Sequence, residues 1–150
     1  AAFLNTIANE GVYVAPAFVE GILDEDTGLL QEQIYQKQSR KVLKDQTAEL
    51  LSQMLIGVVE EGIGQAARPP EGGAGGKTGT AQTGSYTEDG TEKMNLWFGG
   101  FFPAEKPKYT IVVLQDFQVQ PASSSARSCS RDCSALIDQE RRGQAAGAEL

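Results

Sequence analysis

Apolar positions between residues 45 and 61 fall three or four residues apart, which is the spacing of one helix face. We expect this helix to start near Asp45 and to end at Glu61, because the glycine at position 62 suits a helix terminus. Its predicted buried stripe consists of Ala48, Leu51, Met54, Leu55 and Val58. A shorter helical repeat lies at the start of the chain and stops before Gly11; it consists of Phe3, Leu4, Ile7 and Ala8.

The rest of the pattern favours strands. Residues 12–14 form a short β-rich run, and 18–23 with 29–38 predict a hairpin around the turn residues 24–28. Three strands are expected later in the chain, at 77–83, 96–102 and 109–117, joined by a polar connection at 85–95 and a tight turn at 103–107. Short links favour an antiparallel meander, and the apolar residues of 109–117 suit a central strand. We also expect Trp97 and Phe98 to lie in the core.

Helices followed by an antiparallel sheet predict an α+β fold. A last helix is expected at 126–141, with Cys129 and Cys133 on its apolar stripe, and 143–150 is expected to be a flexible tail. Two cysteines four residues apart are more typical of buried apolar positions than of a disulfide framework.

Composition narrows the possible functions. The net charge is −7 and no long basic run is present, which argues against a nucleic-acid surface. The chain contains no histidine, so Ser-His-Asp chemistry within it is excluded and a zinc site is not expected. Any acid–base chemistry must therefore come from lysine, carboxylate or tyrosine side chains, and no cofactor is expected.

The segment 76–82 carries the most informative chemistry, with the sequence Gly76-Lys77-Thr78-Gly79-Thr80-Ala81-Gln82. Its first three residues match the end of a phosphate-binding loop, but such a loop would need a glycine at position 71, which is Glu71. No apolar strand precedes the segment, and the glycines at positions 79 and 84 argue against a helix after it. The remaining alternatives are an ordinary edge strand and the Lys-Thr-Gly element of serine enzymes that react with β-lactams.

The flanking sequence resembles the transpeptidase domain of the penicillin-binding proteins, closest in pattern to the class B enzymes. The resemblance rests on Thr6 to Val14, Met54 to Gly64, Gly76 to Gln82, Trp97 to Ala104 and Pro107 to Tyr109. It implies a penicillin-binding, β-lactamase-like fold with a five-stranded antiparallel sheet flanked by helices. Residues 1–142 would be the C-terminal part of that domain.

The resemblance also implies the roles of individual residues. Lys77 would supply positive charge and assist proton transfer, and Thr78 and Thr80 would offer hydroxyls to a substrate carboxylate. The backbone N–H of Thr80 would form part of an oxyanion hole. Alternation along a strand places Thr78, Thr80 and Gln82 on one face, and Gly79 leaves room for an extended peptide; we therefore expect Gly79 and Gln82 to contact substrate as well.

The family's S-x-x-K and S-x-N motifs are absent from these 150 residues. The resemblance therefore implies a segment that supplies the Lys-Thr-Gly strand while the nucleophile lies in preceding sequence. The substrates would be D-Ala-D-Ala stem peptides and β-lactams, and the partners would be proteins of cell-wall synthesis or division. The location would be the outer face of the bacterial cytoplasmic membrane, with an anchor outside this chain. The alternative is a non-catalytic binding or scaffolding module with the same fold.

Overall fold

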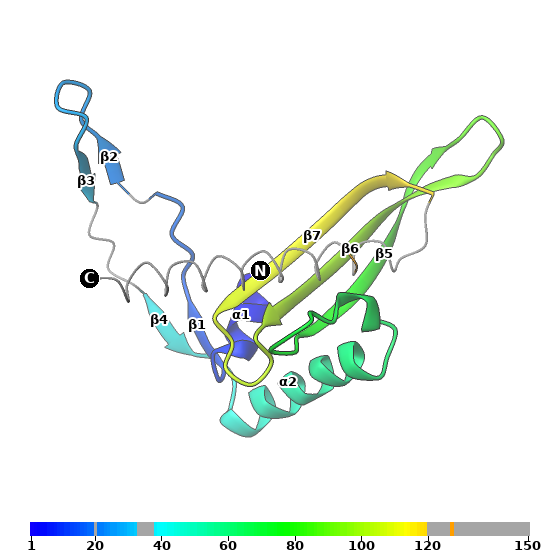
Figure 1. Ribbon diagram of the computed structural model, residues 1–150, viewed down its shortest axis with the longest axis horizontal. Coiled ribbons are helices and arrows are strands. Elements are labelled where there is room, and N and C mark those ends of the chain that lie inside the picture. The colour runs from blue at the N-terminus through cyan, green and yellow to red at the C-terminus, as the bar shows by residue number, and fades with distance from the viewer. Residues whose placement is uncertain (20, 33–37, 120–126, 128–150) are drawn as a thin grey trace.

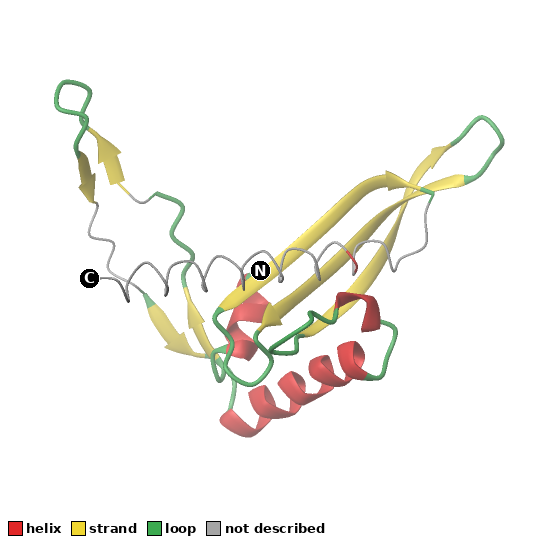
Figure 2. Cartoon of the chain, viewed as in Figure 1, coloured by secondary structure: helices red, strands yellow, loops and turns green. Residues whose placement is uncertain are grey.

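The computed structural model describes residues 1–19, 21–32, 38–119 and 127 (Figure 1). Helices and strands are mixed, as expected for an α+β fold (Figure 2). The elements in chain order are α1 (Ala2–Ala8), β1 (Val12–Val14), β2 (Gly21–Leu23), β3 (Leu30–Glu32), β4 (Ser39–Lys41), α2 (Asp45–Glu60), the 3-10 turn η1 (Gln65–Ala67), β5 (Gly75–Tyr86), β6 (Glu92–Phe102) and β7 (Tyr109–Gln118).

An antiparallel sheet of β5, β6 and β7, in that order, forms the body of the molecule. Helix α2 and η1 lie along one face of this sheet, and α1 lies at the other face (Figure 1). The position of α1 is marked by Leu4, whose Cδ1 lies 2.8 Å from the point where a Cβ on Gly99 would be. The expected meander is therefore confirmed, with helices on both sides of it.

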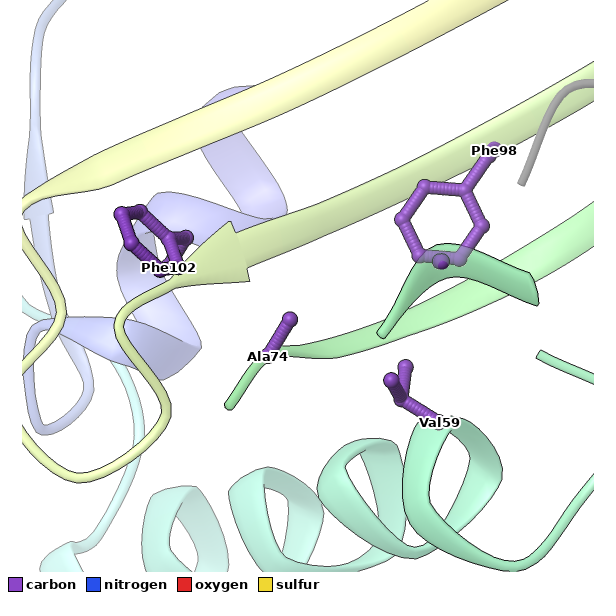
Figure 3. Packing of buried hydrophobic residues seen from close by; sticks show 5 residues of the cluster. Val59, Ala74, Phe98 and Phe102 are labelled. Atoms are coloured by element: carbon purple, nitrogen blue, oxygen red, sulfur yellow. The ribbon is translucent and has the colours of Figure 1, made fainter. Parts of the chain in front are cut away.

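The core lies between α2 and the sheet (Figure 3). Val59 of α2 packs with Phe98 and Phe102 of β6, and the small side chain of Ala74 fills the entrance to β5. Large side chains from the central strand meet a helix here, which is the usual way for a sheet to bury its apolar face. This packing determines where β5 lies relative to α2. It therefore positions the segment 76–82, which belongs to β5.

A second group of strands precedes α2. β1 pairs with β4, and β2 pairs with β3 in a two-stranded arm that extends away from the body (Figure 1). The hairpin prediction for 18–23 and 29–38 is correct in its turn, and among the described residues its paired parts are Gly21–Leu23 and Leu30–Glu32. The pairing of β1 with β4 was not predicted, because the two strands are far apart in sequence.

Several expectations about single residues are wrong. Met54 is 58% exposed. Ala48 is buried as expected, and the other buried position of α2 is Val59, which the predicted stripe did not include. Trp97 is 39% exposed because it points to the face opposite Phe98, since adjacent strand residues alternate.

The strand boundaries also differ from those expected. Most of the polar connection at 85–95 is strand, because β5 continues to Tyr86 and β6 begins at Glu92. This part of the β5–β6 hairpin extends beyond the helices, so it has no helix to pack against. Its strands therefore pair without the apolar pattern from which strands were predicted. Strand β7 lies at the edge of the described sheet rather than in its centre. The predicted helix 126–141, its cysteines and the tail lie outside the described residues, apart from residue 127.

Candidate functional site

The segment 76–82 forms the first half of β5, which is an edge strand within the described part of the sheet. Thr78 lies opposite Phe98 of β6, and Thr80 lies opposite Leu96. Directly opposed residues in an antiparallel pair point to the same face. The two hydroxyls therefore share the face that α2 covers, as the alternation predicted.

The solvent exposure of these side chains differs along this face. Thr78 is buried, whereas Thr80 and Gln82 are exposed beyond the end of the helix cover. The Gln82 amide Nε2 donates a hydrogen bond to Oε2 of Glu92 on the neighbouring strand, at 3.0 Å. The exposed polar groups of this face are therefore the Thr80 hydroxyl and the Gln82 amide, and Thr78 is the inner member of the row.

Lys77 points to the opposite face and is exposed. Its Nζ donates a hydrogen bond to the backbone oxygen of Thr78 at 2.7 Å, which holds the ammonium against its own strand. The neighbouring positions on this face are glycines: 75 and 79 along the strand, and Gly99 directly across from Lys77. Positions 75, 79 and 99 therefore place no side chain of their own beside the cation, although the ring of Phe101 packs over Gly75 and Leu4 packs over Gly99.

Those glycines meet different constraints. A Cβ on Gly75 would lie 2.4 Å from Cζ of Phe101, and one on Gly76 would lie 2.4 Å from Cζ of Phe98. A Cβ on Gly79 would lie 3.5 Å from Cβ of Trp97, an ordinary contact distance. Packing therefore requires glycine at 75 and 76, but packing among the described residues does not require it at 79.

The arrangement combines a cation, accessible polar groups and a strand edge without bulk. Such an edge suits an extended peptide, which can add its own backbone to the sheet, and a lysine suits a terminal carboxylate. A strand follows Lys77 where a phosphate-binding loop would need a helix, which agrees with the exclusion of that motif. Within the described residues, no group of three or more His, Cys, Asp and Glu could hold a metal ion.

Trp97 is the residue at this site that the sequence argument misplaced. It lies directly across from Gly79, on the same face as Lys77, and is partly exposed there. The signal was available in the sequence, because adjacent residues of a strand cannot both face one core. Trp97 therefore lies on the Lys77 face of the sheet, and of these two adjacent residues only Phe98 is a core residue.

A hollow in the described part of the chain lies elsewhere. It has a volume of about 650 Å³ and lies between the end of α1, the first half of α2 and the β6–β7 turn, with Asn9, Ser52 and Pro107 in its wall. None of the residues 76–82 lines it. The segment 76–82 therefore forms one side of a candidate binding site, and none of the described residues forms the opposite side. No helix in the described parts is long and apolar enough to cross a membrane.

Comparison with known proteins assigns this chain to a family. The model of the penicillin binding protein transpeptidase domain matches residues 1–130. The chain is 31% identical over 140 residues to penicillin-binding protein PbpB of Mycolicibacterium smegmatis, covering 85% of this chain and 21% of that protein. It is also 31% identical over 146 residues to penicillin-binding protein 2B of Streptococcus pneumoniae, covering 88% and 21%.

Solved structures agree with the sequence relatives. Penicillin-binding protein 3 of Mycobacterium tuberculosis superposes with a TM-score of 0.73 at 26% identity, over 93% of this chain and 34% of that one. The D,D-transpeptidase domain of a peptidoglycan glycosyltransferase from Eggerthella lenta gives a TM-score of 0.73 at 26% identity, over 92% and 31%. The chain spans about a fifth of the length of the curated relatives named above. It belongs to the penicillin-binding protein transpeptidase family, with relatives of class B, and represents part of that domain.

Proposed function

We propose that residues 1–142 are the C-terminal part of the transpeptidase domain of a peptidoglycan D,D-transpeptidase, and that they supply one wall of its active site. The observation that carries this proposal is the extended strand 76–82, with the Lys77 ammonium on one face and exposed Thr80 and Gln82 on the other. The family match over residues 1–130 supports the same conclusion.

The substrate in this proposal is the D-Ala-D-Ala end of a stem peptide. Lys77 provides positive charge for the terminal carboxylate and for proton transfer, and the hydroxyls of Thr78 and Thr80 donate hydrogen bonds to the carboxylate. The backbone N–H of Thr80 points to the developing oxyanion, a contribution typically worth about 3 kcal/mol of barrier. Gly79 and Gln82 line the path of the peptide backbone.

The nucleophile comes from a part of the protein that this chain does not contain, because no serine here has lysine three residues later. A serine hydroxyl attacks the carbonyl carbon between the two D-alanines, and its proton passes to the departing D-Ala amine. The resulting acyl ester is then attacked by an amine of a second stem peptide, which forms the cross-link and releases the serine. β-Lactams acylate the same serine, in keeping with the solved complexes of the Mycobacterium tuberculosis protein with aztreonam and with ampicillin.

This reaction requires the outer side of the cytoplasmic membrane, where peptidoglycan is cross-linked. The proposal therefore places the protein there, held by an anchor outside these residues and working beside proteins of cell-wall synthesis or division.

Labelling with a fluorescent penicillin tests the proposal. We expect the complete protein to be acylated, the 150-residue chain alone to remain unlabelled, and Lys77→Ala in the complete protein to slow acylation by about 10²–10³-fold. Lys106→Ala, on the exposed β6–β7 turn, is the matched control and should label normally. Acylation of a serine within residues 1–150 would refute the proposal that the nucleophile lies outside this chain. A complete protein that binds stem peptide without being acylated would support the alternative of a scaffolding module.

A further inference from the structure

The Gln82 side chain has a partner that determines which of its two polar groups faces a ligand. Its Nε2 donates a hydrogen bond to Oε2 of Glu92 at 3.0 Å. An ionised carboxylate accepts hydrogen bonds and donates none, so the NH₂ group of the amide must be the end that faces Glu92. The carbonyl oxygen Oε1 of Gln82 is therefore turned away from Glu92, at an exposed position. No described residue donates a hydrogen bond to this oxygen.

A bulge in the β5–β6 hairpin brings these two side chains together, in the part that extends beyond the helices (Figure 1). Gln82 lies opposite Met94, and the next pair joins Tyr86 to Glu92. Residues 83–85 of β5 therefore face a single residue of β6. The middle one of the three is a glycine with φ at +70°, a conformation that glycine adopts without strain. Bulges of this kind redirect side chains and are common beside active sites.

Glu92 also brings a negative charge to the face of the sheet that carries Thr80. Alternate residues of a strand share a face, so Glu92 lies on the same side as Leu96, the residue opposite Thr80. The neighbouring Lys93 falls on the other side for the same reason. Glu92 is half-buried and forms no ion pair with a described residue. Its charge therefore acts on whatever lies beside Gln82.

The position of Gln82 along β5 indicates which part of a ligand it meets. The proposed function places the ligand carboxylate at Thr78 and Thr80, and Gln82 is two residues further on. Two residues of a strand span about 7 Å, so Gln82 meets an extended ligand at about that distance from its carboxylate. The outward carbonyl accepts a hydrogen bond, and the carboxylate behind it attracts positive charge and repels negative charge. This point of the site therefore suits an ammonium group and disfavours a carboxylate.

We propose that Glu92 is a positioning residue that determines specificity: it orients the Gln82 amide and supplies the charge that selects an ammonium over a carboxylate at this point of the ligand. The inference rests on the proposed function, because it requires the ligand carboxylate to bind at Thr80. Glu92 acts through Gln82 and takes no part in acyl transfer. At an exposed site the preference should be about ten-fold in acylation rate, and added salt should reduce it.

Two penicillins that differ only in carrying an ammonium or a carboxylate on the same side-chain carbon test the inference. The second-order rate constant of acylation of the complete protein is measured for each. The readout is the ratio of the two constants, because general damage to the fold slows both reactions alike. We expect the unchanged protein to prefer the ammonium compound by about ten-fold. Glu92→Gln should bring the ratio close to one, since it removes the charge and lets the Gln82 amide turn round.

Two further variants separate the Gln82–Glu92 pair from other effects. Glu92→Asp keeps a carboxylate at this position and should retain most of the preference. Glu88→Gln is the matched control, because it changes the net charge by the same amount at an exposed residue in the turn of the same hairpin. It should leave the ratio unchanged.

The inference is overturned, while the proposed function stands, if both penicillins acylate the unchanged protein at equal rates or if Glu92→Gln keeps the full preference. An equal fall of the ratio in Glu88→Gln also overturns it, because the net charge of the hairpin would then be responsible. Acylation by neither penicillin would refute the proposed function itself, and this inference with it.

Discussion

Alanine at Gly76 and alanine at Gly79 are the same chemical change on the same strand, yet the structure predicts opposite outcomes. At Gly76 the new Cβ would lie 2.4 Å from Cζ of Phe98 and 2.8 Å from the backbone oxygen of Gly99. Neither group can move away easily, because Phe98 is fully buried and the oxygen belongs to the central strand. Overpacking of this kind costs about 1–3 kcal/mol.

At Gly79 the new Cβ would lie 3.5 Å from Cβ of Trp97 and would meet nothing closer in the described chain. Alanine also lowers the conformational entropy of the unfolded chain, which stabilises compatible sites by about 0.4–1 kcal/mol. We therefore expect Gly79→Ala to keep or slightly raise the free energy of unfolding. For a domain of this size, each kcal/mol shifts Tm by about 2–4 °C.

Urea and thermal unfolding of the two variants beside the unchanged protein measure the difference. Gly76→Ala should lower Tm by roughly 2–12 °C, and Gly79→Ala should not lower it. In the complete protein, Gly79→Ala should nevertheless slow acylation by fluorescent penicillin, because its methyl group occupies the open edge beside Lys77. Equal destabilisation by both substitutions would refute the packing argument.

Three further outcomes follow from the fold. Phe98→Ala should cost about 3–5 kcal/mol of unfolding free energy in urea titrations, whereas Phe18→Ala, at a side chain that is 90% exposed, should change it by less than about 0.5 kcal/mol. Gly11→Ala should destabilise the chain by about 1–3 kcal/mol, because φ at this residue is +83° and the new Cβ would lie 2.6 Å from the backbone oxygen of Leu43; Gly28→Ala, also at positive φ but in open space, is the control and should cost less. The side-chain and backbone hydrogen bonds from Thr27 lower the pKa of Asp24, so the turn at 24–28 should hold above the ordinary aspartate pKa and loosen as pH falls through the lowered value. NMR titration of the Asp24 carboxyl should show the lowered pKa, and Thr27→Ala should raise that pKa by removing the side-chain hydrogen bond while the backbone N–H at position 27 remains.

Much of this structure could be predicted from local sequence patterns. The helical repeat and the glycine at position 62 placed α2 within one residue of its observed end, and the turn residues 24–28 located the arm. The row of Thr78, Thr80 and Gln82 followed from strand alternation alone. These features depend on neighbouring residues, which is why a single sequence is sufficient for them.

Features set by distant contacts were not accessible in the same way. The pairing of Val14 with Ser39 brings together residues far apart in the chain, and no local pattern announces it. Val59 rather than Met54 became buried because the direction of approach of β5 selects the helix face. The burial of Thr78 likewise depends on that approach, so its depth relative to Thr80 could not be deduced from alternation.

The glycines of β5 have a consequence for how this sequence can vary. Position 76 is restricted by the side chains beneath it, so any selection for a folded protein should keep glycine there, with or without a ligand present. Position 79 has room for a methyl group, so a library sorted for folding alone should drift away from glycine at that position. A library sorted for penicillin binding should retain glycine at both. Comparing the two sorted populations would separate the residues that build the strand from those that keep it open to a substrate.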